Sequence, residues 1–130
     1  MADKLHFSLV SPARELYAGE VDQVDIPGTE GDLGVLPDHT PLMAAIRTGT
    51  ITVFNDGSTD HYFIQGGFAD VTPAGLTVLA EKAIPMADVD AAMLEAEITR
   101  LETEMGNMTG DTALAAAQDL DGLRATLASV

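Results

Sequence analysis

Residues 28–43 hold the densest group of side chains capable of chemistry, and they read GTEGDLGVLPDHTPLM. Three glycines spaced by three residues suggest a phosphate-binding loop, but the segment lacks the Lys-Ser/Thr end of such a loop. Glu30 and Asp32 would also put negative charge where a phosphate should lie. His39 follows Asp38 and could act as an oriented base, yet no nucleophile motif accompanies it. We therefore predict a structural or interface role for His39 rather than catalysis, and no catalytic residue in the segment.

The same segment contains the residues of a stiff loop. Pro37 and Pro41 fix their own φ angles and favour extended geometry at the residues before them. Gly31 and Gly34 permit bends that other residues resist. A stiff, exposed, acidic loop loses little conformational entropy on binding, which suits a docking surface. A plain connection between two strands is the alternative.

The composition excludes several classes of function. Twenty-one acidic residues against six basic ones give a net charge of −15, which repels nucleic acid and anionic lipid. The chain has no cysteine, so disulfides, thiolate catalysis and zinc–thiolate sites are excluded. The first residues form no apolar signal core, and no run of 18 apolar residues occurs. We expect a cytoplasmic chain with no cofactor, no metal site and no direct insertion into a membrane.

The first 85 residues have the pattern of strands and turns. Leu5, Phe7 and Leu9 alternate with polar residues, which is the period of a half-buried strand. The same period recurs at Val24 and Ile26, Ile51 and Val53, Tyr62 and Ile64, and Leu76, Val78 and Ala80. Asn55-Asp56-Gly57 lies between two such stretches and is typical of a hairpin turn. Many short strands at this spacing predict an antiparallel sandwich or barrel.

After Pro85 the pattern changes to that of helices. Apolar residues recur at steps of three and four from Ala87 to Met105 and again from Ala113 to Val130. The break between the two stretches contains two glycines, which predicts an antiparallel helical hairpin. The residues expected along its seam are Leu94, Ile98, Leu101, Leu120, Leu123 and Leu127. We therefore predict an α+β chain, with a β-sandwich domain at residues 1–85 and a helical hairpin domain at residues 86–130.

The sequence resembles the epsilon subunit of bacterial F-type ATP synthases, the counterpart of the mitochondrial delta subunit. The most recognisable segment is EGDLGVLPDHTPLM, with LHFSLVSPARELYAGEVDQVDIPG before it and IQGGFADVTPAGLTVLAEKAI after it. It extends from Leu5 to Ile84, and the C-terminal part is similar in length and helical type. The resemblance implies an antiparallel β-sandwich of about ten strands followed by a C-terminal two-helix hairpin.

The resemblance also implies a function. Such a subunit lies in the central stalk, binds the gamma subunit, stands on the c-ring and is no enzyme by itself. The acidic loop of such a subunit faces the polar loops of the ring, so the resemblance makes Glu30, Asp32 and His39 the candidate contact residues for the c-ring and gamma. It is peripheral to the cytoplasmic face of the bacterial inner membrane, and it turns with gamma and the ring so that proton flow drives ATP synthesis. The catalytic alpha and beta subunits are further candidate partners, through the helical hairpin. The competing interpretation is an acidic β-sandwich binding module unrelated to rotary ATPases.

The predicted first helix departs from the motif of nucleotide-sensing family members. That motif has Ile or Leu, then Asp, two variable residues and Arg-Ala, whereas residues 89–94 here read VDAAML. Met93 stands at the arginine position and cannot donate hydrogen bonds to a phosphate. Residues 86–130 contain two arginines and nine acids, a local charge of −7. This charge would repel the acidic segment that inhibitory members contact. We expect no nucleotide binding and a chiefly structural hairpin.

Overall fold

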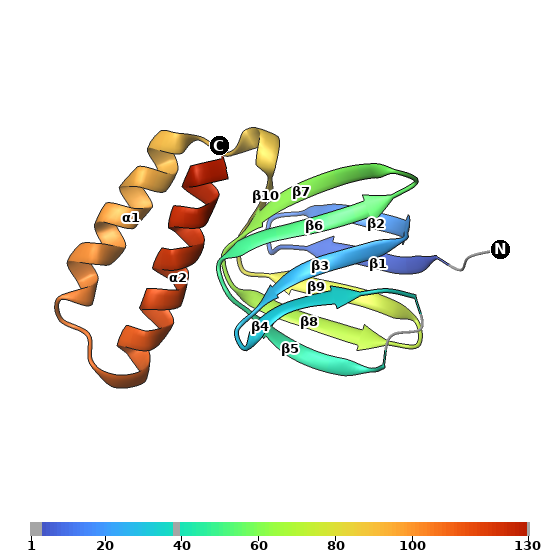
Figure 1. Cartoon of the computed structure of the whole chain (residues 1–130), viewed down its shortest axis with the longest axis horizontal. Coiled ribbons are helices and arrows are strands. Elements are labelled where there is room, and N and C mark those ends of the chain that lie inside the picture. Colours follow the sequence, from blue (N-terminus) through green and yellow to red (C-terminus); the bar gives the residue numbers. More distant parts are fainter. Residues whose placement is uncertain (1–3, 38–39, 130) are drawn as a thin grey trace.

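The computed structural model describes residues 4–37 and 40–129, which form ten strands followed by two helices (Figure 1). This is the predicted α+β arrangement of a β-sandwich and a helical hairpin. A short 3-10 helix, η1 (Met86–Asp88), leads into α1 (Ala91–Met105) and α2 (Gly110–Ser129). The strands are β1 (Leu5–Val10), β2 (Glu15–Val21), β3 (Gln23–Gly28), β4 (Gly31–Val35), β5 (Leu42–Ile46), β6 (Gly49–Asn55), β7 (Ser58–Ile64), β8 (Gly67–Thr72), β9 (Gly75–Ala80) and β10 (Ala83–Pro85).

The ten strands form one sheet that folds back on itself. Their order is β10-β7-β6-β3-β5-β8-β9-β1-β2, and β4 pairs with β3 outside this path. The recorded pairings are antiparallel apart from that of β1 with β9, which is parallel. At the corner, Gly28 of β3 pairs with Ile46 of β5. The sheet closes far enough for β2 to contact β6 and β10, which removes most exposed strand edges.

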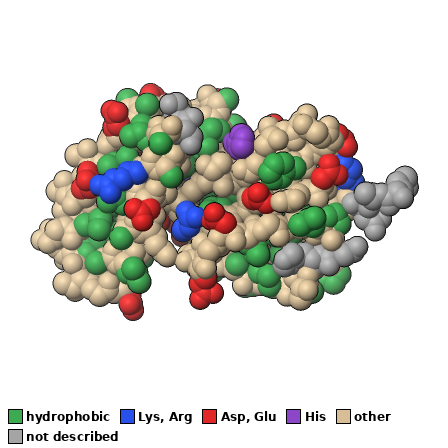
Figure 2. All heavy atoms as spheres, viewed as in Figure 1, with side chains coloured by type: hydrophobic (Ala, Val, Ile, Leu, Met, Phe, Trp, Pro, Cys, Tyr) green, Lys and Arg blue, Asp and Glu red, His purple; other side chains and the backbone are tan. Residues whose placement is uncertain are grey.

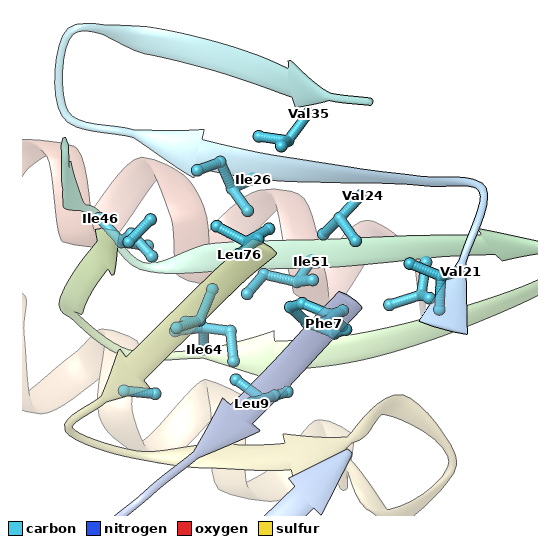
Figure 3. Close-up of a cluster of buried hydrophobic side chains, with 14 of the residues drawn as sticks. Phe7, Leu9, Val21, Val24, Ile26, Val35, Ile46, Ile51, Ile64 and Leu76 are labelled. Atoms are coloured by element: carbon cyan, nitrogen blue, oxygen red, sulfur yellow. The ribbon is translucent and has the colours of Figure 1, made fainter. Parts of the chain in front are cut away.

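The main core lies between the two layers of the sheet. Inward-facing residues such as Phe7, Leu9 and Leu76 are fully buried, as the alternation in the sequence predicts. Figure 3 shows that Phe7, Ile51, Ile64 and Leu76, from four different strands, point toward one another. The turn predicted at Asp56 and Gly57 is confirmed: β6 ends before it, β7 begins after it, and the two residues have φ angles of 52° and 81°.

A second core holds the helices together and attaches them to the sandwich. Leu94 and Leu101 of α1 pack with Leu120 and Leu123 of α2, and Phe63 of β7 joins them. Ile98 and Leu127 are partly buried against this cluster. In Figure 1 the helices stand at one end of the sandwich, and α2 lies between α1 and the strands.

The first helix begins later than its apolar period predicts. Ala87 belongs to η1 rather than to α1. Asp90 is the N-cap of α1, because its Oδ1 accepts a hydrogen bond from the backbone amide of Ala92 at 2.9 Å. An aspartate that accepts a helix amide in this way fixes the start of the helix. The aspartate of the nucleotide-sensing motif therefore has a structural role in this chain.

Candidate functional site

The segment predicted to be a stiff loop is in part a β-hairpin. Residues 31–35 form β4, which pairs antiparallel with β3 around a turn at Thr29 and Glu30. A Cβ atom on Gly28 would lie 2.5 Å from the carbonyl oxygen of Gly31, and Gly31 itself has a φ angle of 133°. Gly28 is therefore required by the close approach of the backbones at this turn, and Gly31 by its positive φ angle. We call Thr29, Glu30, Gly31 and Asp32 the acidic tip.

Strand β4 separates the two halves of the predicted docking segment. The acidic tip is at its beginning, and Leu36 and Pro37 follow its far end, roughly 17 Å away for five extended residues. Pro37 and Pro41 line a hollow together with Lys4 and His6, at the end of the sandwich where β1 begins. The acidic tip and the two prolines thus belong to different regions of the surface. Asp38 and His39 lie outside the described residues.

Asp32 forms an ion pair within the chain. The guanidinium of Arg47, between β5 and β6, donates from Nη2 to Asp32 Oδ1, and its Nη1 donates to the carbonyl oxygen of Thr48 at 3.4 Å. The Arg47 side chain is only 28% exposed, so this cation is held in place. Glu30 is exposed at the turn, and the described residues supply no ion pair to it. Glu30 is therefore the uncompensated charge of the acidic tip.

The second helix packs directly against the acidic tip. Gln118 donates from Nε2 to the carbonyl oxygen of Thr29 at 3.0 Å, and Asp119 accepts a bond from the hydroxyl of Thr48 at 3.0 Å. A Cβ atom on Gly122 would overlap the carbonyl oxygen of Thr48. The sequence analysis missed these residues. The available signal was Gly122 itself, because a glycine inside a helix of alanine and leucine often marks a close approach of backbones.

The sandwich also has an apolar outer surface that the sequence analysis missed. Val10 of β1 lies beside Leu79 of β9, Leu79 beside Phe68 of β8, and Phe68 beside Ala45 of β5. Phe68 is 56% exposed and Leu79 is 57% exposed. We call Val10, Ala45, Phe68 and Leu79 the outer apolar patch. Leu79 could have indicated it, because an apolar residue at that position breaks the alternation of Leu76, Val78 and Ala80.

Comparison with known proteins assigns the fold to a family. The family profile described as "ATP synthase, Delta/Epsilon chain, beta-sandwich domain" matches residues 4–86. The chain belongs to the ATP synthase delta/epsilon family. This confirms the resemblance drawn from the sequence.

Relatives in this family match most or all of the chain. The ATP synthase epsilon chain of Hyphomonas neptunium is 47% identical over 135 residues, covering 99% of this chain and all of the relative. The epsilon chain of Maricaulis maris is 61% identical over 99 residues, covering 76% of this chain and 74% of the relative. The epsilon chain of Caulobacter vibrioides is 58% identical over 84 residues, which cover 65% of this chain but 98% of the relative.

Solved structures from the same kind of assembly share the fold. A chain in the Euglena gracilis mitochondrial ATP synthase (OSCP/F1/c-ring in rotational state 1) has a TM-score of 0.79 at 20% identity, covering 99% of this chain and 82% of that one. A chain in the central stalk/c-ring structure of the Tetrahymena thermophila mitochondrial ATP synthase has a TM-score of 0.64 at 14% identity, covering 96% of this chain and 98% of that one.

Met93, at the position of the motif's arginine, lies among both apolar and charged side chains. It lines a hollow together with Phe63 and Ile84, and Lys82 and Glu97 line the same hollow. The two arginines of the hairpin, Arg100 and Arg124, each form ion pairs with glutamates on the helices. The hydrogen bond from Arg100 lowers the pKa of Glu97 below its ordinary value, although burial acts in the opposite direction. Both guanidiniums are therefore paired with carboxylates of the hairpin in this arrangement.

The described residues give no indication of a metal centre. No group of three or more His, Cys, Asp or Glu side chains within residues 4–37 and 40–129 is placed to hold a metal ion. His6 on β1 lies 3.6 Å from Glu20, and His61 on β7 contacts the hydroxyl of Thr52 at 3.2 Å. In the same part of the chain, neither helix has the length and apolar character needed to cross a bilayer.

Proposed function

We propose that this chain is a rotor subunit in the central stalk of a proton-translocating F-type ATP synthase. In this role it links gamma to the c-ring and has no catalytic activity of its own. The observation that carries the proposal is the match with an epsilon chain over the whole length of both proteins, at 47% identity. The sandwich with its helical hairpin supports it, because the same fold occurs in two ATP synthase assemblies. These matches do not support the competing interpretation, an acidic binding module unrelated to rotary ATPases.

We assign the outer apolar patch to the gamma subunit. Phe68 and Leu79 are exposed, and the half-buried Val10 and Ala45 flank them across four neighbouring strands. Contiguous exposed apolar residues of this kind mark interfaces on soluble proteins. Met43 extends the patch along β5 and is 70% exposed. The patch is built on paired strands, so its side chains are already positioned before gamma binds.

We assign the acidic tip to the polar loops of the c-ring. Glu30 is exposed at a turn whose shape requires two glycines and whose backbone is held by the bond from the Thr29 amide to the Ala45 carbonyl oxygen. Figure 2 shows that acidic side chains outnumber basic ones on the face in view. A single uncompensated carboxylate on a rigid turn is suited to an ion pair across a small contact. Pro37 and Pro41, at the other end of β4, would instead stiffen a separate edge of the sandwich.

The remaining assignments follow from charge and from the two cores. The chain would be peripheral to the cytoplasmic face of the bacterial inner membrane, held there by gamma and the ring. The helical hairpin would be chiefly structural, because residues 86–130 carry a charge of −7 and their arginines are paired. Contact of the hairpin with the catalytic alpha and beta subunits would then be weak and not inhibitory.

Residues 1–85 would act as a domain able to fold without the hairpin. Their core is separate from that of the helices, which recruit mainly Phe63 and Ile84 from the strands. The Caulobacter vibrioides relative supports this division, since 84 aligned residues make up 98% of its length. An epsilon chain of that size has room for a sandwich but little else.

The gamma assignment is tested by affinity purification of the tagged chain from detergent-solubilised membranes. We expect gamma and the c subunit to co-purify with the unmodified chain. Phe68→Lys and Leu79→Lys should each lose gamma, because a buried lysine would lack a partner in an apolar interface. Leu114→Lys is the matched control, since Leu114 is also an exposed leucine, at 65%, but lies on α2. Retention of gamma by both patch variants would refute the assignment.

The ring assignment is tested by ATP-driven proton pumping in inverted vesicles over a range of salt concentrations. Glu30→Lys should lower pumping at low salt, and the defect should shrink as salt screens the repulsion. One exposed ion pair contributes about 0.2–1 kcal/mol, so the loss should be partial. Pro37→Ala changes no charge, and any defect it causes should not depend on salt. Full pumping by Glu30→Lys at low salt, with normal occupancy of the subunit, would exclude the tip from the contact.

A further inference from the structure

A hydrogen bond between distant parts of the chain holds the backbone of the acidic tip. Nε2 of Gln118, on α2, donates to the carbonyl oxygen of Thr29 at 3.0 Å, across 89 residues of sequence. The amide of Thr29 donates to the carbonyl oxygen of Ala45 at 3.0 Å. The peptide groups on both sides of Thr29 are therefore bonded, one to the helix and one to β5. This fixes the chain immediately before Glu30.

A second set of contacts reaches the other side of the tip. The carboxylate of Asp119 accepts a hydrogen bond from the hydroxyl of Thr48, which is 3% exposed. The carbonyl oxygen of Thr48 accepts a bond from Arg47, and Arg47 pairs with Asp32. Two neighbouring helix residues, Gln118 and Asp119, thus connect to the first and last residues of the acidic tip.

Both connections depend on close packing of α2 against the sandwich. Gly122 is one turn further along α2, and its lack of a side chain lets the helix backbone meet the carbonyl of Thr48. Side-chain hydrogen bonds of about 3 Å cannot survive a helix displacement of more than a fraction of an ångström without rearrangement. The tip is therefore held in this way only while α2 lies on the strands.

We propose that Gln118 is a positioning residue for the acidic tip, so that packing of α2 on the sandwich sets the conformation that the tip presents to the c-ring. The identity of the ring as partner rests on the proposed function, whereas the positioning itself is a property of the isolated chain. The hairpin then has a role that requires neither nucleotide nor inhibition. It keeps the acidic tip in one conformation.

Amide hydrogen exchange in the isolated full-length chain tests the positioning. Gln118→Ala and the isosteric Gln118→Glu both remove the donor, and each should accelerate exchange at residues 29–32 by about three- to tenfold. Gln118→Lys restores a donor of sufficient reach and should return most of the protection. Asp121→Asn, an exposed change on the same helix, is the control. Exchange at the β8 and β9 amides should not change. Unaltered exchange at the tip in Gln118→Ala would overturn the proposal.

Proton pumping separates this proposal from the assignment of the partner. Membranes carrying Gln118→Ala should pump less than membranes with the unmodified chain, at equal occupancy of the subunit. Faster exchange at the tip with unchanged pumping would keep the positioning role and overturn the ring as the partner of the tip. Unchanged exchange would overturn the positioning role whatever the pumping. Gly122→Ala gives an independent variant, which should accelerate exchange at the tip and at Thr48 together.

Discussion

The substitution Gly122→Ala tests the packing between the second helix and the sandwich, because two known effects act on it in opposite directions. Gly122 lies inside α2, where alanine is favoured over glycine by about 0.8–1.0 kcal/mol. A Cβ atom at this position would overlap the carbonyl oxygen of Thr48 and approach the Thr48 Cβ to 3.2 Å. The sign of the stability change therefore reports whether the close contact exists.

The magnitude follows from the nature of the obstructing atom. A backbone carbonyl cannot move out of the way by changing rotamer, so either the helix or the backbone at Thr48, just before β6, must shift. Overpacking of this kind costs about 1–3 kcal/mol. After subtracting the gain in helix propensity, we expect Gly122→Ala to lower the free energy of unfolding by about 1 kcal/mol and at most about 2 kcal/mol. The same shift of the helix should weaken the hydrogen bonds of Gln118 and Asp119 to the sandwich.

The assay is equilibrium unfolding in urea, followed by far-ultraviolet circular dichroism. Ala115→Gly is the matched control, since Ala115 is exposed on the same helix and should lose about 1 kcal/mol through propensity alone. We expect both variants to be less stable than the parent chain. An increase in stability of about 1 kcal/mol for Gly122→Ala, beside the normal loss in the control, would show that α2 does not contact Thr48 in solution.

Three further predictions concern the domains, the nucleotide and the pH dependence. The 1–85 fragment should unfold cooperatively in urea, because its core is separate from that of the helices; a broad transition without a folded baseline would contradict this. Millimolar ATP should not raise the melting temperature, whereas a ligand at one hundred times its Kd would add about 2.7 kcal/mol; a rise with ATP but not with polyphosphate would show that Met93 does not prevent binding. Lys4 donates to Asp22 at 2.7 Å and lowers the pKa of that carboxyl, so this stabilisation is present above the ordinary aspartate pKa and is lost as pH falls through the lowered value. The Lys4→Ala variant should therefore begin to unfold in acid at a higher pH than the parent chain, in a titration followed by circular dichroism. An unchanged pH of onset would refute this prediction.

The sequence by itself determined the elements with a local periodic signal. Leu5, Phe7 and Leu9 alternate because one side of β1 is buried and the other is not, and the same holds for β9. The turn at Asp56 and Gly57 was predictable because positive φ angles select these residue types. The helical seam was predictable for the same kind of reason, since a helix with one buried stripe repeats its apolar residues every three or four positions.

Strand β4 has no such signal and was missed. Two of its five residues are glycines, and its exposed and buried positions do not alternate cleanly. It is a strand because β3 offers a partner edge across a two-residue turn, and this pairing is not encoded in its own side chains. For the same reason, the sequence could not indicate that β4 places the acidic tip and the two prolines at opposite ends of the sandwich.

The contacts that define the candidate site were decided only by the tertiary structure. Arg47 and Asp32 are 15 residues apart, and Gln118 and Thr29 are 89 residues apart, so no local pattern links them. The outer apolar patch exists because strand order brings β5, β8, β9 and β1 side by side in register. Periodicity reports which side of an element is buried, whereas pairing and packing determine which residues of different elements meet.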